Sequence, residues 1–215
     1  MFLFENQSMC ALENTVLSQG YGRIAGMDEA GRGALAGPVV AACVMLNPAQ
    51  IPAGINDSKK LTNKRRRELY DRIQEQAIAI GVGRVEPRVI DDINIYNATK
   101  LAMKKALGNL RAPPDFLLID AVKLYDISIS SVSLPKGDEK SVSIAAASII
   151  AKVYRDNVMI EYADRYPEYR FSSHKGYGTA AHRDALRMYG PTELHRFSYM
   201  PVRDVYEIWK SREQP

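Results

Sequence analysis

The stretch of sequence that decides the fold is residues 23–46, RIAGMDEAGRGALAGPVVAACVML. Residues 23–28 have the pattern of a β-strand that ends in acids, Asp28 and then Glu29. A glycine-rich turn follows, and the unbroken apolar run from Val39 to Leu46 is typical of a buried strand. This segment therefore predicts two neighbouring strands with carboxylates at the end of the first.

Helices and strands alternate along the rest of the chain. Strand patterns cover residues 77–85, 116–120 and 127–134, and helical patterns cover residues 61–76, 90–110, 141–166, 179–189 and 203–210. The first half of 141–166 is small and apolar, so we expect it to be the central buried helix. Two early strands followed by this alternation predict an α/β fold with a mixed sheet. Residues 1–20 form a short polar lead-in with some helical character.

Length and composition are those of a globular protein of one domain. The chain has 215 residues, of which 46% are hydrophobic and 25% are charged, and a domain usually has about 100–200 residues. No apolar run approaches the ~20 residues of a membrane helix, and the first 20 residues lack the pattern of a signal peptide. We therefore expect a cytoplasmic protein in which Cys10 and Cys43 are unpaired thiols.

The positive charge of the chain is concentrated in one segment. The formal net charge is only +4, which by itself says little about a nucleic-acid partner. A cluster of basic residues lies between positions 59 and 67: Lys59, Lys60, Lys64, Arg65, Arg66 and Arg67. Such a cluster is typical either of a solvated helix face or of a surface that contacts phosphates.

Carboxylates follow two of the predicted strands and precede the central helix. Asp28 and Glu29 end the first strand, Asp120 ends the strand at 116–120, and Asp138 comes just before the helix at 141. In open α/β sheets ligands gather at the carboxyl ends of strands. Each of these acids taken alone could equally be a helix cap or a surface charge.

If the four acids meet, they require cations. Two like charges ~4 Å apart repel by about 4 kcal/mol at an effective dielectric near 20. Oxygen ligands favour hard ions such as Mg²⁺ or Mn²⁺. Because strand neighbours point to opposite faces, we expect the strand to break between Asp28 and Glu29 if both are to share the site. The glycines at 26, 31 and 33 permit such a break.

The glycine-rich turn does not fit the nucleotide-binding motifs that it superficially matches. Gly31-Arg32-Gly33 begins a Gly-x-Gly-x-x-Ala pattern, but Gly37-Pro38 and a strand follow it where a helix is required. A loop whose backbone approaches a ligand closely fits better, with Arg32 as a donor suited to phosphate. The three histidines, at 174, 182 and 195, lack zinc spacing, and no serine nucleophile motif is present.

Several segments, in order along the chain, resemble the signature of ribonuclease HII. They are residues 26–42, 56–61, 119–120, 136–138, 143–156, 174–179 and 195–197. The resemblance implies a ribonuclease H-like fold, an α/β fold with a mixed five-stranded sheet flanked by helices and a small helical C-terminal region. It divides the chain into a lead-in, residues 1–20, and a catalytic domain, residues 21–215.

The resemblance also implies a role for individual residues. Asp28, Glu29, Asp120 and Asp138 would bind two divalent ions, Mn²⁺ or Mg²⁺, and form the catalytic centre. The backbone of Gly31, Arg32 and Gly33 would read the ribose 2′-hydroxyl, Tyr177 would pack on the next sugar, and Lys59 with the basic run after it would contact phosphates. Ala34 replaces the usual proline. A fourth acid that is Asp, and a short lead-in, favour ribonuclease HII over ribonuclease HIII.

The implied enzyme is a metal-dependent endonuclease that hydrolyses the RNA strand of RNA–DNA hybrids. It would also cut on the 5′ side of ribonucleotides embedded in duplex DNA, leaving 5′-phosphate and 3′-hydroxyl ends. Its partners would be these duplexes, with neither a membrane nor an obligate protein partner. Two alternatives remain open: a non-catalytic hybrid binder, which has no need of four acids, and a small-molecule phosphatase, for which the basic run would be idle.

Overall fold

The computed structural model describes residues 8–212, which divide into two compact units. Unit 1 consists of residues 8–30, Val40–Arg84 and Lys100–Val153. Unit 2 consists of Gly31–Val39, Val85–Thr99 and residues 154–212. Each unit is described by itself below. The sequence-based boundary at residue 20 stays a prediction, although residues on both sides of it belong to unit 1.

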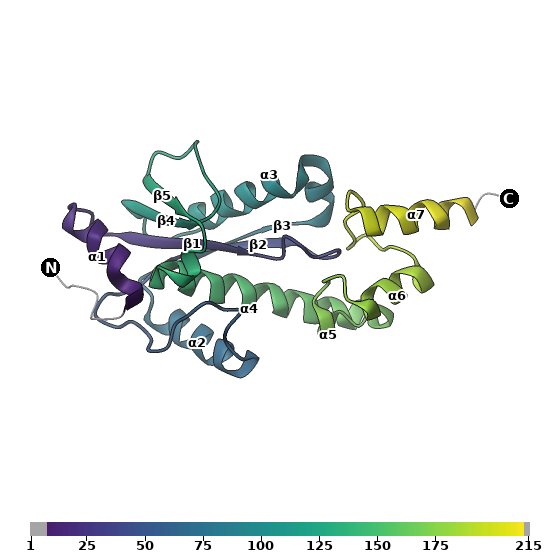
Figure 1. The fold of residues 1–215 in the computed structure, drawn as a ribbon, viewed down its shortest axis with the longest axis horizontal. Helices are drawn as coiled ribbons and strands as arrows, with labels where there is room; N and C mark the ends of the chain where they lie inside the picture. The colour runs from purple at the N-terminus through teal and green to yellow at the C-terminus, as the bar shows by residue number, and fades with distance from the viewer. Residues whose placement is uncertain (1–7, 213–215) are drawn as a thin grey trace. The chain divides into compact units, whose positions relative to one another are not determined.

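A mixed five-stranded sheet forms the framework of unit 1, as the sequence predicted (Figure 1). The strands are β1 (Ile24–Ala30), β2 (Val39–Met45), β3 (Ala79–Val85), β4 (Phe116–Asp120) and β5 (Ser130–Leu134), in the order β3-β2-β1-β4-β5. β1 pairs with β2 antiparallel and with β4 parallel, and β4 pairs with β5 parallel. The central strand β1 is therefore the one that leads directly into the first two acids.

Helices cover both faces of this sheet (Figure 1). The second half of α3 (Pro87–Gly108) packs on β3, where a Cβ added to Gly83 would lie 2.0 Å from the carbonyl oxygen of Ala102. On the other face, the start of α4 (Val142–Arg165) packs on β1 at Gly26. Figure 1 shows α2 (Asn63–Gln76) on the same side as α4. The first residues of α4 are fully buried, so it is the central helix that the sequence predicted.

The polar lead-in contains a helix that is anchored to α4. Helix α1 (Ala11–Ser18) carries Glu13, whose side chain is completely buried. Oε1 of Glu13 accepts hydrogen bonds from Oγ of Ser141 at 2.5 Å and from the backbone N–H of Ser143 at 3.0 Å. Burial raises the pKa of Glu13, and these two hydrogen bonds oppose that shift. The lead-in thus caps the first turn of the buried helix.

The structure corrects the predicted elements in three places. β1 continues through Ala30, with Glu29 paired to Ala41 on β2, so the strand does not break between Asp28 and Glu29. Helix α3 is interrupted at Asn94, where φ is 66° and ψ is 164°. The last strand starts at Ser130, three residues later than expected, because residues 127–129 lie outside the ladder with β4.

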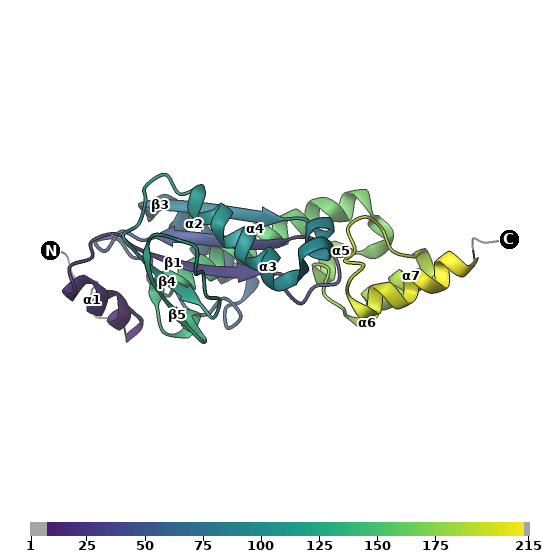
Figure 2. The ribbon, with the colours of Figure 1, turned by 90° about the horizontal axis from the view of Figure 1, so that it is seen from above.

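Unit 2 is helical and has its own small core. It contains the second part of α4, α5 (Phe171–His174), α6 (Ala180–Tyr189) and α7 (Met200–Arg212) (Figure 2). Its core is formed by Ala36, Met159, Tyr169, Phe171 and Leu194. The small helical C-terminal region expected from the resemblance is part of this unit.

Two further expectations concern thiols and membranes. Cys10 and Cys43 are buried and form no disulfide, as predicted. Within residues 8–212, no helix is both long enough and apolar enough to span a membrane.

The contact between Gly26 and α4 predicts a steric penalty for any side chain at this position. A Cβ on Gly26 would lie 2.0 Å from the carbonyl carbon of Ser143, and neither backbone can yield easily. We expect Gly26→Ala to lower the free energy of unfolding by about 1–3 kcal/mol, as overpacking does. Gly108→Ala is the matched control because a Cβ there meets nothing within 4 Å. Urea denaturation of both variants checks this, and an equal effect of the two substitutions would contradict it.

Candidate active site

Two of the predicted acids lie side by side at the carboxyl ends of adjacent strands. β1 and β4 are parallel, with Met27 opposite Ile119, so Asp28 and Asp120 occupy the next position on each strand. Asp28 is only 4% exposed, and Asp120 is half-buried. Residues from distant parts of the chain thus meet because the strand register is fixed by the apolar residues that precede them.

The surroundings of Asp28 disfavour its negative charge. Burial raises the pKa of Asp28 well above its usual range, and repulsion from the carboxylates of Glu29 and Asp120 raises it further. Hydrogen bonds from Ser148 and from the backbone N–H of Glu29, the latter at 2.7 Å from Oδ1, act in the opposite direction. A cation bound here would relieve both the desolvation and the repulsion.

The third acid is attached to the second through the backbone. Asp138 lies in a short 3-10 helix, η2 (Gly137–Glu139), and is 3% exposed. The backbone N–H of Gly137 donates to Oδ1 of Asp120 at 2.6 Å, which holds η2 at the end of β4. Asp28, Asp120 and Asp138 therefore belong to one region of unit 1.

Lys59 is also part of this region. Its Nζ lies 3.3 Å from Oδ2 of Asp138 while 78% of its side chain remains exposed. Partial burial alone would lower the pKa of Lys59, but the nearby carboxylates of Asp138, Asp28 and Asp57 outweigh it and raise the pKa. The ammonium group is thus a resident cation beside the acids.

Glu29 is the next residue after Asp28 on β1, which stays regular through Ala30, and Oε2 of its side chain is buried. The expectation of a strand break was wrong, since the ladder with β2 continues past both acids. Glu29 lies close enough to repel the carboxylate of Asp28.

A set of supporting residues behind the acids was missed in the sequence. Ser148 on α4 donates to Asp28, and since a carboxylate only accepts, the Ser148 oxygen is left to accept from Ser58 at 2.8 Å. Arg66, which is 8% exposed, holds this loop through bonds to the carbonyls of Ser58 and Leu61. A lone serine in the apolar run of α4 was the available signal.

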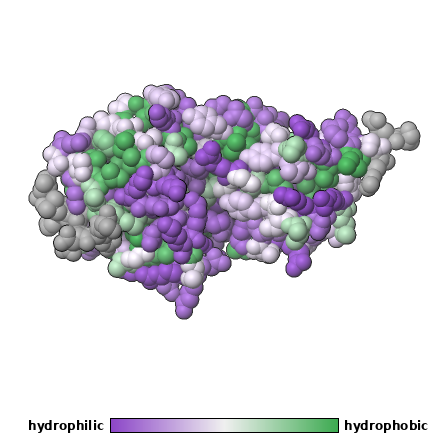
Figure 3. Space-filling model, viewed as in Figure 1, coloured by the Kyte–Doolittle hydropathy of each residue, from purple (hydrophilic) through white to green (hydrophobic). Residues whose placement is uncertain are grey.

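The basic run therefore has two kinds of members. Arg66 is buried and structural, which differs from the expectation that the whole run contacts phosphates. Lys60, Lys64 and Arg67 are exposed, although Lys60 also pairs with Glu139 at 3.4 Å. On the face shown in Figure 3, hydrophilic side chains predominate over α2 and the loop before it.

The acids fit an open site for hard cations rather than a closed one. Within residues 8–212, no group of three or more Asp, Glu, His or Cys side chains is placed to hold a metal ion by itself. Mg²⁺ commonly takes only one or two carboxylates and fills its remaining positions with water and substrate phosphates. The carboxylate oxygens of Asp28, whose pKa is raised by burial and by neighbouring carboxylates, are suitable ligands for such an ion.

In unit 2 the glycine loop is held from behind by a buried arginine. Arg196 is completely buried, and its guanidinium donates to the carbonyls of Gly31 at 2.7 Å, Arg32 at 2.8 Å and Gly37 at 2.9 Å. Gly31 has φ of 95°, which favours glycine. A Cβ on Gly33 would meet nothing within 4 Å, so the space in front of Gly33 is open.

Tyr177 lies beside this loop within the same unit. It forms an isolated bridge with Ala34, and its ring centroid is 5.2 Å from Cζ of Arg155. Its carbonyl oxygen is 3.0 Å from Nδ1 of His182. The glycine loop and the tyrosine, 146 positions apart in the sequence, are thus neighbours in the fold.

The three histidines form a hydrogen-bonded cluster whose protonation follows from its partners. Nδ1 of His182 must donate to the Tyr177 carbonyl, so its Nε2 accepts from Nε2 of His195 at 3.1 Å. Nδ1 of His195 then accepts from the backbone N–H of Thr192 at 3.0 Å. His174 stacks on His182 with ring centroids 4.5 Å apart. His174 donates from Nε2 to the carbonyl of Tyr169 and accepts at Nδ1 from the N–H of Gly176, so all three histidines are neutral in this arrangement.

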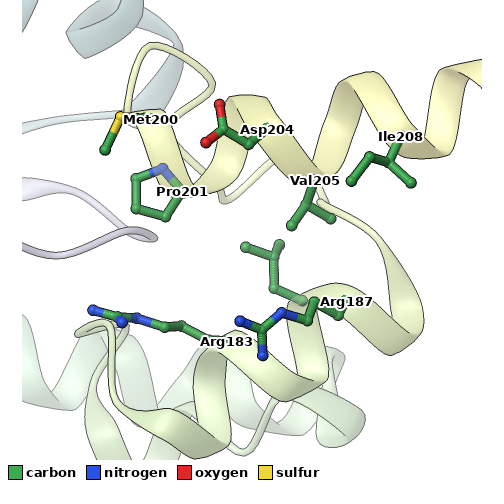
Figure 4. A pocket seen from close by; sticks show the side chains of 8 residues that line it. Arg183, Arg187, Met200, Pro201, Asp204, Val205 and Ile208 are labelled. Atoms are coloured by element: carbon green, nitrogen blue, oxygen red, sulfur yellow. The ribbon is translucent and has the colours of Figure 1, made fainter.

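A groove between α6 and α7 contains none of the predicted site residues. Figure 4 shows Arg183 and Arg187 on α6 facing the apolar side chains of Pro201 and Val205 on α7. Arg187 pairs with Asp184 on its own helix at 2.9 Å. This groove is a surface feature of unit 2.

Comparison of the sequence with models of protein families identifies the relatives of this chain. The model for ribonuclease HII matches residues 25–202. The chain belongs to the ribonuclease HII family. Ribonuclease HII of Acetivibrio thermocellus is 55% identical over 191 residues, which cover 89% of this chain and 75% of that protein. Ribonuclease HII of Caldicellulosiruptor bescii is 48% identical over 200 residues, which cover 93% and 97%.

Solved structures agree with this membership. Ribonuclease H2 from Pyrococcus horikoshii OT3 matches with a TM-score of 0.75 at 25% identity, over 88% of this chain and 99% of that one. The ribonuclease HII in a PCNA complex from Archaeoglobus fulgidus matches with a TM-score of 0.72 at 27% identity, over 83% and 95%. The predicted ribonuclease H-like fold is confirmed, and a ribonuclease HII is a nuclease and hydrolase.

The histidine cluster predicts a loss of stability in mild acid. Burial lowers the pKa of His182 to about 4 and that of His195 to about 3, whereas both have a pKa near 6.5 when unfolded. The unfolded chain therefore binds protons first as the pH falls below 6.5. Linkage gives a loss of about 2 kcal/mol per histidine at pH 5.

Urea unfolding of the wild type and of His182→Gln at pH 7 and pH 5 tests this linkage. The variant lacks one of the two strongly shifted groups, so its stability is expected to fall about half as much between the two pH values. The same fall in both proteins would contradict the assignment.

Proposed function

We propose that this chain is an endoribonuclease that hydrolyses the RNA strand of RNA–DNA hybrids and cuts on the 5′ side of ribonucleotides embedded in duplex DNA. The products would carry 5′-phosphate and 3′-hydroxyl ends. Membership of the ribonuclease HII family supports a ribonuclease activity. The observation that carries the proposal is that the buried Asp28 and Asp138 lie in one region with the half-buried Asp120, in a chain that also has the glycine loop.

Asp28, Glu29, Asp120 and Asp138 are the proposed ligands of two Mg²⁺ or Mn²⁺ ions. Bound there, the ions would supply activation of the attacking water and stabilisation of the leaving 3′-oxygen. The chain itself keeps the carboxylates oriented. Ser148 and the backbone N–H of Glu29 fix Asp28, and the N–H of Gly137 fixes Asp120.

Recognition of ribose is the proposed task of the glycine loop. Neither packing nor backbone conformation requires a glycine at position 33. A Cβ there would meet nothing within 4 Å, and Gly33 does not have a positive φ. A glycine that the protein's own structure does not require suits the close approach of a ligand. The ribose 2′-hydroxyl both donates and accepts hydrogen bonds, so it suits a backbone partner.

Tyr177 and Lys59 complete the proposed substrate contacts. Packing of the Tyr177 ring on the sugar of the following nucleotide would favour RNA–DNA junctions. The exposed ammonium of Lys59 would contact a phosphate, and its pairing with Asp138 keeps it at the acids. The cytoplasmic location and the lack of an obligate protein partner, both expected from the sequence, are part of the same proposal.

Asp28→Asn tests the role of the acids. The substitution keeps the shape of the side chain but removes its charge, so cleavage is expected to fall by more than about 100-fold, since even outer-shell changes at metal sites cost 10–100-fold. Binding of the duplex is expected to survive. The measurement is cleavage of a labelled DNA duplex with one ribonucleotide, in Mg²⁺ and in Mn²⁺, beside binding measured by anisotropy.

Asp71→Asn is the matched control, because Asp71 is an exposed acid on α2 within the same unit. Normal cleavage by Asp28→Asn would refute the assignment of the acids. A wild type that binds the duplex without cutting it would make the chain a hybrid binder. Cleavage of small phosphate esters that long duplex does not inhibit would make it a phosphatase.

Tyr177→Ala tests the proposed sugar contact. A single embedded ribonucleotide offers one junction, whereas a long hybrid offers ribose at every position and many binding registers. We therefore expect kcat/KM to fall more for the single-ribonucleotide duplex, by roughly tenfold or more, in line with about 1–3 kcal/mol for loss of an aromatic stacking contact. Tyr177→Phe keeps the ring and is expected to retain activity on both substrates. Equal losses on both substrates would argue against the sugar contact.

A further inference from the structure

We propose that Arg155 is a positioning residue that aligns the glycine loop with Tyr177 and thereby sets the preference for isolated ribonucleotides. The inference rests on the proposed function, because it takes the glycine loop as the ribose reader and Tyr177 as the sugar contact. Arg155 itself lies behind these elements and is not expected to touch the substrate.

Arg155 is a completely buried guanidinium whose partners are backbone carbonyls. Nε donates to the carbonyl of Pro38 at 2.9 Å, Nη1 to that of Lys175 at 3.0 Å and Nη2 to that of Ala36 at 3.2 Å. Burial lowers the pKa of Arg155 to about 10, so the group stays charged at neutral pH. Burying a charge is unfavourable unless each donor finds a partner in a defined place.

Those partners come from the two segments that the proposed function needs. Ala36 and Pro38 follow the glycine loop, and Lys175 precedes Tyr177 by two residues. The guanidinium also packs against Gly31, where a Cβ would lie 2.0 Å from Nε, and lies 5.2 Å from the Tyr177 ring centroid. One rigid, planar group thus touches both recognition elements from behind.

Arg196 differs from Arg155 in its partners. Its donors contact the carbonyls of Gly31, Arg32 and Gly37 and the hydroxyl of Tyr199, all on the side of the glycine loop. The side-chain hydrogen bonds of Arg196 therefore hold the glycine loop from behind. The backbone N–H groups of Leu35 and Ala36 donate to the carbonyl of Gly176 at 2.8 and 3.3 Å, and Arg155 adds side-chain hydrogen bonds that reach both the loop and the segment that carries Tyr177.

This connection matters most for a substrate with one ribose. A single embedded ribonucleotide must place its 2′-hydroxyl at the glycine loop and the following sugar at Tyr177 at the same time. A long hybrid presents a ribose at every step, so a small misalignment of the two elements can be met by another register. Loss of the guanidinium fork is therefore expected to change the ratio of the two activities.

The experiment compares Arg155→Lys with the wild type on both substrates. Lysine keeps the charge but cannot donate to three carbonyls in a plane. We expect kcat/KM for the single-ribonucleotide duplex to fall at least tenfold, mainly through KM, while kcat/KM for a long hybrid falls less than threefold. Arg187→Lys is the control, because the side chain of Arg187 is two-thirds exposed and pairs with Asp184 on its own helix. Its ratio is expected to equal that of the wild type.

Hydrogen exchange supplies the readout that does not depend on activity. In Arg155→Lys, exchange is expected to rise in residues 31–38 and 175–178 and to stay unchanged in β1 and β4. Arg155→Gln, which keeps two donors without the charge, serves as the second variant if the lysine variant does not fold. Mn²⁺ titration of each variant checks that unit 1 is intact.

The outcomes separate the two proposals. Equal losses on both substrates, or no loss on either, overturn the role of Arg155 whatever the exchange data show. If the wild type does not cut at a single ribonucleotide, the proposed function fails instead. Hydrogen exchange then decides about Arg155 by itself, and unchanged exchange in residues 31–38 and 175–178 overturns the positioning.

Discussion

The active region depends on holding carboxylates together at the end of two parallel strands. The register that sets Met27 opposite Ile119 brings Asp28 beside Asp120, and burial removes the water that would screen them. This arrangement is unfavourable, as the raised pKa of Asp28 indicates. The nearby donors compensate it in part: Ser148 and the N–H of Glu29 on Asp28, the N–H of Gly137 on Asp120, and Lys59 on Asp138. The remaining deficit of positive charge is what a divalent cation would fill.

Unit 2 buries positive rather than negative side chains. Here backbone carbonyls accept hydrogen bonds from Arg155 and Arg196. Carbonyl dipoles that point at a guanidinium are fixed in direction, so a flexible glycine loop acquires a defined shape. The hydrogen-bonded histidines fix the Tyr177 carbonyl in a similar way. Loop precision in this protein therefore comes from buried polar groups behind the loop.

The sequence predicts those features that follow from local pattern. The apolar runs predict the strands and therefore the class of the sheet. An acid that directly follows such a run lies at the carboxyl end of its strand, where ligands bind in open α/β sheets. The continuation of β1 through Ala30 was not predictable, since it depends on pairing with Ala41 on another strand. The burial of Arg66 and Arg155 was not predictable either. Arginine is usually exposed, and only the tertiary contacts show that the donors of these two side chains bond inside the protein.

The same point limits what net charge can say about binding. The value of +4 counts three arginines that are buried and subtracts four carboxylates that are buried as well, Glu13, Asp28, Asp57 and Asp138. None of these groups acts on a distant polyanion as an exposed charge does. In the proposed function, attraction of a duplex would therefore come from exposed residues such as Lys64 and Arg67. Binding strength and cleavage would then depend on different groups, so a substitution that removes the charge of Asp28 can separate them.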